Sequence, residues 1–523
     1  MLRTQFFPAI RAACILGLIF ALTPAASAQI GRPAEKPKPV EPTQNFTVKP
    51  REGEVRATWL RFGEGDALAT PARTAETMRR LREIGFNTVY VSVWQDGYPM
   101  WPSDAFAAAT SGLPGAARIA PEMQAPRDLL SEALIEAHRH GLLFIADFDG
   151  GLASTRRDRE SPLRRREEWN LKDAKGAAMG PRNSSWLNPA HPDVRALMIA
   201  LVSEVVDRYD IDGVQINERF CWADPSLGYD PAAKDLFAKE NSGAAPPADP
   251  REPGWTRWKT QKGVTLLREI AAAVKARRPG LIMSFAAPTP KEAIDQWCCD
   301  WPSLVRLGLF DEIVVRAFRP DMSAFKVAWD EAVTAVAGRR PEMTIGIRAS
   351  GPGGPDLTWT DLKSHIEIAR TAKAGGFALI SDRAITFTYA AALTDFFAVS
   401  TTGQVRHPLR PLTWRPGVLK PERMNTRGRL LVVRGLRGGV YRVIAGGKEP
   451  GVWLESTIRI AEASAVITEE QAAMLSGGGT IEFLVDRRPE NAQAIPDPSL
   501  PTTPPPGTTP SAPKPAGGPG GGS

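Results

Sequence analysis

Eight short apolar stretches rich in β-branched residues recur between positions 55 and 381, and segments with helical periodicity separate them. In two of these segments, 74–84 and 127–140, apolar residues follow helical spacing, and in a third, 192–209, Asp193 and Arg208 suit the opposite ends of a helix dipole. The predicted strands are residues 55–60, 87–94, 142–148, 213–216, 281–286, 312–318, 343–347 and 377–381. Eight alternating units over about 350 residues predict a (β/α)8 barrel of the TIM type.

An open, doubly wound sheet is the structural alternative to the barrel. Such a sheet usually carries a glycine-rich dinucleotide-binding turn after its first strand. The corresponding segment here, Arg61-Phe62-Gly63-Glu64-Gly65, does not have that spacing. The barrel is therefore the favoured fold.

Changes in composition along the chain predict five parts. Residues 1–28 have the pattern of a signal peptide: Arg3 and Arg11, an apolar run, and the small residues Ala26-Ser27-Ala28. Residues 29–50 form a Pro-rich linker, and residues 489–523 a Pro- and Gly-rich tail without the apolar residues of a core. The barrel is expected over residues 51–404, and glycine-broken β runs predict a small β-rich domain over residues 405–488.

The predicted signal peptide implies a periplasmic or secreted protein with no integral membrane segment after cleavage. Cleavage removes Cys14 and leaves Cys221, Cys298 and Cys299. One disulfide with a free thiol and three buried thiols are both consistent with this count, and a zinc site is a remote third option because the spacing fits no usual metal pattern.

Composition narrows the functional class. Hydrophobic residues make up 43% and charged residues 24% of the chain, which are values of a globular protein. The net charge of +7 falls to about +5 without Arg3 and Arg11 and is spread among many acids, so nucleic-acid binding is not implied. The 14 Trp residues outnumber the 6 Tyr residues, and flat indole faces suit a cleft that binds sugar rings.

In a barrel the active site lies at the carboxyl ends of the strands. Asp147 and Asp149 follow the third predicted strand and face the same side, Asn217 and Glu218 follow the fourth, and Arg316 and Arg319 the sixth. Asp382 and Arg383 follow the eighth. Cleavage of a glycosidic bond needs one carboxylic acid and one carboxylate, and Glu218 with Asp149 is the predicted pair. The opposing interpretation is that arginines hold these carboxylates in structural salt bridges.

Other chemistries find less support. The 5 histidines include His138 and His140, which lie two residues apart on a predicted helix and point in different directions, so no metal site is expected. The chain contains no Gly-x-Ser-x-Gly elbow and no Walker-type phosphate loop. Seven tryptophans instead fall on predicted strand-to-helix segments: Trp94, Trp101, Trp169, Trp186, Trp222, Trp297 and Trp301. Together they favour an elongated saccharide cleft, although packing is an equal expectation for each one singly.

Six ordered segments resemble the glycosyl-hydrolase-like family ten. They are Glu54-Val55-Arg56-Ala57-Thr58-Trp59, Gly85-Phe86-Asn87-Thr88-Val89-Tyr90, Trp186-Leu187-Asn188-Pro189-Ala190-His191-Pro192-Asp193-Val194-Arg195, Tyr209-Asp210-Ile211-Asp212-Gly213-Val214-Gln215, Asp300-Trp301-Pro302 and Phe318-Arg319-Pro320-Asp321. The resemblance implies a TIM-type barrel, a secreted or periplasmic setting, action on bacterial envelope or other polysaccharides, and no cofactor.

The chain departs from the family pattern at three strand ends. Asn217-Glu218 stands where the family usually has two aspartates, Asp147-Phe148-Asp149 where it has Trp-Phe-Glu, and Arg316 where it has glutamine. An asparagine cannot act as nucleophile or base. Asn217-Glu218 also resembles the Asn-Glu pair of large barrel glycosidase clans, but those clans need a glutamate after strand seven, where this chain has Arg348-Ala349-Ser350.

Two functions follow from these observations. The first is an exported glycoside hydrolase acting on a polysaccharide, possibly cell-wall glycan, with Glu218 as general acid/base and Asp149 as the second carboxylate. The second is a protein that has lost hydrolysis and only binds glycan or serves as an envelope scaffold. The residues expected to line the cleft are Asp147, Asn217, Trp94, Trp222, Tyr229, Asp230, Arg316 and Arg319.

Overall fold

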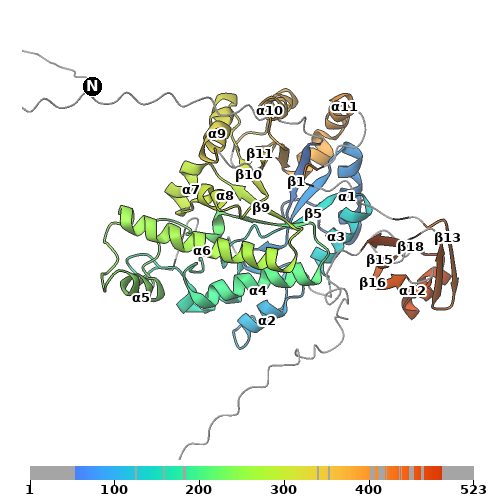
Figure 1. Ribbon diagram of the computed structural model, residues 1–523, viewed down its shortest axis with the longest axis horizontal. Helices are drawn as coiled ribbons and strands as arrows, with labels where there is room; N and C mark the ends of the chain where they lie inside the picture. The colour runs from blue at the N-terminus through green and yellow to red at the C-terminus, as the bar shows by residue number, and fades with distance from the viewer. Residues whose placement is uncertain are drawn as a thin grey trace, which may run out of the picture. The chain divides into compact units, whose positions relative to one another are not determined.

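The computed structural model describes residues 53–123, 127–156, 159–178, 180, 184–337, 341–351, 354–400, 407–409, 419, 421–434, 436, 439–446, 453–460 and 464–485. Within this part of the chain, eight parallel strands close into a barrel surrounded by helices (Figure 1). The strands are β1 (Val55–Leu60), β2 (Thr88–Ser92), β5 (Leu143–Asp147), β8 (Gly213–Asn217), β9 (Ile282–Ala287), β10 (Glu312–Arg316), β11 (Glu342–Arg348) and β12 (Gly376–Ile380). They follow one another round the barrel in chain order, which confirms the (β/α)8 prediction.

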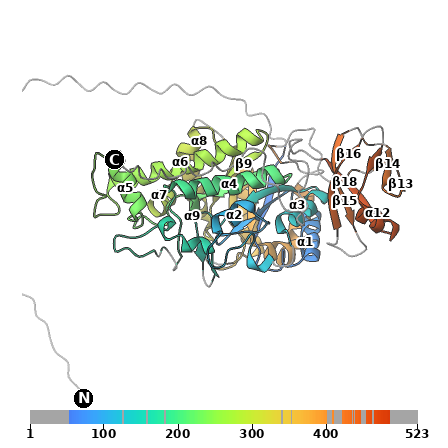
Figure 2. The same cartoon turned by 90° about the horizontal axis from the view of Figure 1, so that it is seen from below.

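Helices fill the segments between the strands. The longer ones are α1 (Pro71–Ile84), α3 (Leu129–Arg139), α4 (Pro192–Arg208), α6 (Pro253–Arg277), α9 (Met322–Ala335), α10 (Trp359–Thr371) and α11 (Ala390–Ser400). The shorter ones are α2 (Asp104–Thr110), α5 (Pro231–Glu240), α7 (Pro290–Trp297) and α8 (Trp301–Arg306). Asp193 and Arg208 occupy the first and last turns of α4, where they complement the helix dipole as predicted. Helices α4 and α6 lie side by side in both views (Figures 1 and 2).

Two short hairpins extend the strand-to-helix segments: β3 (Trp94–Gln95) pairs with β4 (Tyr98–Pro99), and β6 (Thr155–Arg156) with β7 (Arg159–Glu160). Across the described part of the chain, no helix combines the length and the apolar character needed to cross a bilayer.

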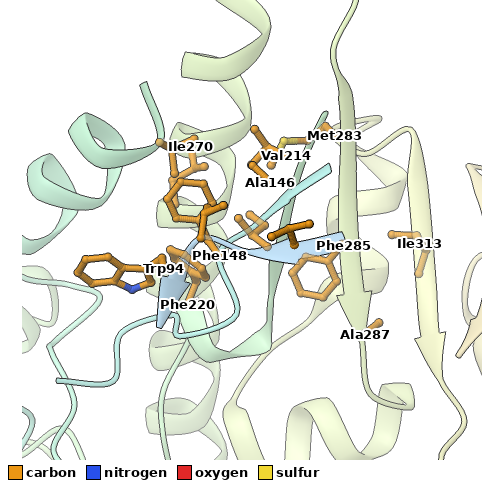
Figure 3. Close-up of a cluster of buried hydrophobic side chains, with 14 of the residues drawn as sticks. Trp94, Ala146, Phe148, Val214, Phe220, Ile270, Met283, Phe285, Ala287 and Ile313 are labelled. Atoms are coloured by element: carbon orange, nitrogen blue, oxygen red, sulfur yellow. The ribbon is translucent and has the colours of Figure 1, made fainter. Parts of the chain in front are cut away.

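Alternation along the strands divides the barrel core into two layers. Outward-facing side chains such as Phe148, Val214 and Phe285 pack against the helices (Figure 3). Inward-facing side chains form a separate apolar cluster inside the barrel: Val55, Ala57, Tyr90, Leu143, Ile145, Ile282, Val314 and Ala378. The lumen is therefore a packed core through most of its depth, and its polar chemistry lies where the strands end.

One buried carboxylate interrupts the apolar lumen. Glu312, at the start of β10, accepts hydrogen bonds from Tyr90 Oη at 3.0 Å and Ser284 Oγ at 2.7 Å. These donors satisfy the carboxylate, because a buried charge without partners would be strongly destabilising. Glu312 thus fixes Tyr90 and Ser284, which support the residues above them.

The chain after the barrel contains two small antiparallel sheets. One has the order β13 (Arg423–Arg427), β14 (Leu430–Arg434), β17 (Ser464–Val466), and the other β16 (Trp453–Ile460), β15 (Gly439–Gly446), β18 (Thr480–Val485). Together with helix α12 (Glu469–Ser476), they enclose a small core that includes Leu431, Val443 and Phe483. The predicted signal peptide, the Pro-rich linker and the C-terminal tail lie outside the described residues.

Candidate active site

The carboxyl end of β5 brings two aspartates to the mouth of the barrel. Asp147 is the last residue of β5 and faces inward, in register with Gln215 on β8 and Ser92 on β2. Asp149 follows in the loop that leads to Gly150 and Gly151. Gly151 has φ +54°, and a Cβ there would lie 2.4 Å from Cβ of Arg219. A glycine is therefore required for this loop to pack against the turn that follows β8.

Asp149 is enclosed by guanidinium groups from two other loops. Arg61, just after β1, donates a hydrogen bond to Asp149 Oδ2 and a second, at 2.8 Å, to Asp96 Oδ2. Arg219 Nη1 lies 3.1 Å from Asp149 Oδ1. With 22% of its side chain exposed, Asp149 still reaches solvent. It is therefore an oriented, ion-paired carboxylate that faces the mouth of the barrel.

Asn217 connects the two strand ends. Its Nδ2 donates to the backbone oxygen of Asp149 at 3.1 Å, and its Oδ1 accepts from the backbone N–H of Arg219 at 3.0 Å. An amide supplies both a donor and an acceptor, whereas an ionised aspartate supplies acceptors alone. Asparagine at this position therefore suits a structural link between the β5 and β8 loops.

Glu218 is buried in an ion pair. It begins the short turn Glu218–Phe220, and its Oε2 accepts a hydrogen bond from Nη2 of Arg316 at the end of β10. The Glu218 side chain is 3% exposed and the Arg316 side chain 18%. The pair spans β9, which lies between β8 and β10. Glu218 is thus held in place by the guanidinium group of Arg316.

Asp147 has the opposite electrostatic environment. The residue is 5% exposed, and its Oδ1 has no hydrogen-bond partner among the described residues. Burial, and after it the charge of Asp149, raise the pKa of Asp147 well above its ordinary range, against the lowering effects of Arg316, Arg219 and Arg61. Burial therefore favours the protonated form of Asp147, which lies near the ion-paired Asp149 in the floor of the site.

Trp59 forms the other part of the floor. It continues the inward-facing series Val55 and Ala57 on β1, and its side chain remains partly exposed. Its Nε1 donates to Gln215 Oε1 at 2.8 Å, and Gln215 in turn donates to Ser284 Oγ at 2.9 Å. Trp59 is absent from the predicted site residues, although an inward-facing aromatic residue near the carboxyl end of a barrel strand is a signal that could have identified it.

Comparison with known proteins places this site in a family. The sequence pattern of the family described as "Glycosyl hydrolase-like 10" matches residues 54–349, which is more than half of the chain. The chain belongs to this glycosyl hydrolase-like family. The resemblance predicted from the six sequence segments is thereby confirmed, and the chain is a glycosyl hydrolase-like barrel.

Curated relatives of this glycosyl hydrolase-like protein match along part of its length. Glycosyl hydrolase DigH of Escherichia coli K12 is 26% identical over 221 residues, which are 39% of this chain and 45% of DigH; DigH of Shigella flexneri gives the same values. The match thus spans less than half of these relatives.

Solved structures similar to this chain include two glycosidases. The glycoside hydrolase domain of PgaB (BpsB) from Bordetella bronchiseptica has a TM-score of 0.48 and 13% identity, covering 66% of this chain and 100% of that domain. A β-galactosidase from Halorubrum lacusprofundi has a TM-score of 0.48 and 12% identity. The match covers 67% of this chain and 59% of that enzyme.

Two tryptophans of this family member, Trp94 and Trp222, were expected to line the cleft, and the structure instead gives them the packing role that was the alternative for each. Trp94 and Trp222 are completely buried, and their Nε1 atoms donate to the backbone oxygens of Gly151 at 2.8 Å and Lys259 at 2.7 Å. Figure 3 shows Trp94 near Phe148 and Phe220, outside the lumen. A fully buried indole offers no face to a sugar, so in this structure both side chains support the loops from behind.

Tyr229, Asp230 and Arg319 also serve local structure. Tyr229 Oη donates to the backbone oxygen of Pro247 at 2.9 Å. Asp230 caps α5 by accepting from the N–H of Ala233 at 3.0 Å, and it accepts from Asn188 Nδ2 at 2.8 Å. Arg319, 33% exposed, pairs with Glu292. None of these interactions involves Asp147, Asp149 or Glu218, which form the centre of the site.

The barrel also contains three cysteines and the buried Asp382. Cys221, Cys298 and Cys299 are buried free thiols, in line with the second of the cysteine expectations. Within the described residues no group of three or more His, Cys, Asp and Glu side chains could hold a metal ion. Asp382, after β12, is 7% exposed, and burial with the charges of Asp66 and Glu64 raises its pKa to about 6.

Proposed function

We propose that this protein hydrolyses a glycosidic bond at the carboxyl end of its barrel, with Asp147 as the proton donor and Asp149 as the carboxylate. The observation that carries the proposal is the pairing of a buried carboxyl with a raised pKa, Asp147, with a neighbouring carboxylate held by Arg61 and Arg219. Two carboxyl groups whose environments push their protonation states apart are the arrangement that glycoside hydrolysis needs.

In this mechanism Asp147 transfers its proton to the glycosidic oxygen as the bond to the anomeric carbon breaks. Asp149, the more exposed of the two ion-paired carboxylates, stabilises the positive charge that develops at that carbon or activates the water that attacks it. Arg61 and Arg219 hold Asp149 in one orientation, which lowers the cost of reaching the transition state.

This proposal gives Glu218 a different role from the one predicted from the sequence. The Glu218 side chain is buried, and its Oε2 is engaged by Nη2 of Arg316. Glu218 therefore acts as a positioning residue: it fixes Arg316 beside Asp147.

The test is release of reducing ends from a panel of polysaccharides by the purified protein. Asp147→Asn and Asp149→Asn should each lower turnover by about 10²–10⁴-fold, the range expected for loss of a general acid or base. Asp235→Asn, an exposed carboxylate on α5, is the matched control and should turn over at the wild-type rate. Undiminished turnover by Asp147→Asn would overturn the assignment.

A second candidate function is glycan binding without hydrolysis. It is favoured by one observation: both carboxylates predicted as catalytic, Asp149 and Glu218, are in contact with arginines. Retention of the wild-type protein on insoluble glycan, with no reducing ends released from any polysaccharide, would support this function. Turnover by the wild type would exclude it.

The cellular location of the protein and its substrate are further parts of this proposal. The signal-like pattern of residues 1–28 supports export to the periplasm or the exterior, and the family relationship supports an envelope polysaccharide as substrate. Mass spectrometry of the protein made in a bacterial host should find a mature chain that begins at Gln29. An intact chain confined to the cytoplasm would contradict export.

A further inference from the structure

Trp59 is packed against two aromatic rings and one amide near the carboxyl end of β1, and it remains partly exposed. Its ring lies over Tyr90, with centroids 5.4 Å apart and planes inclined by 32°, and Phe318 meets it edge-on at 6.1 Å. The hydrogen bond from Nε1 to Gln215 fixes the rotation of the indole. Trp59 is the fifth of the six residues of β1 and in register with Tyr90 on β2, so the part of its side chain that remains exposed lies near the carboxyl ends of the strands.

Strand β11, which only β12 separates from β1, leaves room for the indole. Gly346 on β11 faces the lumen, and a Cβ at this position would lie 3.2 Å from Cη2 of Trp59. Such a contact is tighter than the normal van der Waals range, so even alanine would require one side to move. The sequence therefore keeps a space in the upper lumen that Trp59 occupies.

The polar groups beside Trp59 retain unused hydrogen-bonding capacity. Asp147 Oδ1 has no partner among the described residues. Arg316 directs Nη2 to Glu218, and its other guanidinium nitrogens make no hydrogen bond within the described part of the chain. A partly exposed indole with an acid and a guanidinium among the neighbouring strand-end residues suits the apolar face and the hydroxyl groups of a pyranose ring.

The charges of the site argue against an acidic sugar. Arg61 pairs with Asp96 and Asp149, Arg219 also pairs with Asp149, and Arg316 pairs with Glu218. Three cations thus meet three carboxylates, before Asp147 is counted. No excess of positive charge is left to compensate the desolvation of an anionic ligand, so binding a uronate or a phosphate here would be unfavourable.

We propose that Trp59 is the stacking platform of a subsite for an uncharged pyranose ring, with Arg316 and Asp147 as its polar contacts. This subsite deepens the proposed function, on which it rests, because it sets the substrate class: a neutral hexose or N-acetylhexosamine polymer. Gln215 is a positioning residue that keeps the indole in place.

The experiment measures binding separately from turnover. The protein carrying Asp147→Asn, which removes the proposed proton donor and keeps the three ion-paired carboxylates, is titrated by calorimetry. Chitotetraose and cellotetraose are the neutral probes and tetragalacturonate is the acidic probe. Trp59→Ala in the same background should weaken binding of the preferred neutral probe by about tenfold or more, as for other buried aromatic contacts at binding sites. Trp59→Phe keeps an aromatic ring and should retain part of the affinity. Near-ultraviolet circular dichroism of each variant shows whether it is folded. Trp359→Phe, which alters a partly exposed indole on α10, is the matched control and should bind as the parent does.

The outcomes distinguish failure of the subsite from failure of the proposed hydrolysis. Equal affinity of the parent and Trp59→Ala, tighter binding of tetragalacturonate than of either neutral probe, or no binding of a neutral probe by the parent would overturn it. Trp59-dependent binding without turnover by the wild type would retain the subsite and remove the proposed hydrolysis. Full turnover by Trp59→Ala would remove the subsite and retain the proposed hydrolysis.

Discussion

Arg316 reaches across β9 to donate a hydrogen bond to Glu218, so two strands that are not neighbours share one buried ion pair. On β9, Ala286 is in register with Asn217, the residue before Glu218. The pair holds the β8 turn against the β10 end and thereby defines one wall of the site. Breaking this ion pair should be strongly destabilising, because Glu218 is almost completely removed from water.

The first prediction concerns this pair. Arg316→Ala leaves a buried carboxylate unpaired and should lower the free energy of unfolding by about 3–5 kcal/mol. Arg316→Ala combined with Glu218→Gln should recover much of that loss, because the uncompensated charge is gone. Urea unfolding of the two single variants and the double variant measures the coupling. Strictly additive effects would show that the pair is not the source of the loss.

The pH dependence of turnover follows from Asp147. Its pKa is raised, so the carboxyl is protonated at low pH and loses its proton as the pH rises through that value. We expect kcat/KM to fall on the alkaline side with a limb well above about 4, the ordinary range for aspartate. The pH–rate profile of the wild type measures this limb. A limb at the ordinary aspartate value would contradict the role of Asp147 as proton donor.

Asp382 provides a stability test that is independent of catalysis. Its pKa rises from 3.8 to about 6 in the folded protein, so the folded state binds this proton more tightly than the unfolded state does. The free energy of unfolding therefore falls as the pH rises from about 4 to 6, by at most about 3 kcal/mol at about 1.4 kcal/mol for each pKa unit.

Asp382→Asn should accordingly be more stable than the wild type above pH 6 and equal to it below pH 4, in thermal or urea unfolding. Asp235→Asn supplies the comparison with an exposed carboxylate and should show no such crossover. A constant difference at every pH would mean that the effect has nothing to do with proton binding.

Gly151 allows a prediction about the loop that carries Asp149. Gly151→Ala forces a positive φ on alanine and places Cβ against Arg219. Gly112 has φ +75°, and a Cβ added there would have no atom within 4 Å, so Gly112→Ala carries the backbone cost without the clash. Gly151→Ala should be less stable than Gly112→Ala by about 1–3 kcal/mol, the usual cost of overpacking, and should lose turnover. Equal stability of the two variants would show that the close approach is not required.

The number of reactive thiols tests whether the three cysteines are free and buried. Cys221, Cys298 and Cys299 are buried and free, and burial raises the pKa of Cys298 to about 11, which further suppresses its reactivity. The native mature protein should react with no thiol reagent, and after denaturation it should show three thiols. A single thiol after denaturation would instead reveal a disulfide.

The barrel could be predicted from the sequence because its signals are local. The period of the apolar residues along each segment is set by strand and helix geometry, and each of the eight barrel strands overlaps a predicted one. The same local reasoning placed Asp147, Asp149, Asn217, Glu218 and Arg316 at strand ends, where the structure brings them together. The family relationship followed from the same short segments.

The roles of these residues depend on contacts that form when the barrel closes. The burial of Trp94 and Trp222, the exposure of Trp59, the Arg316–Glu218 pair across β9 and the raised pKa of Asp147 all arise from side chains that are distant in the chain. Burial and charge pairing depend on which neighbours the closed barrel supplies, and the spacing of residues along one strand carries no information about the strand opposite. Residue order is thus enough to specify the scaffold and the strand ends at which the chemistry lies, whereas packing across the barrel determines which acid holds a proton and which indole is left open to a ligand.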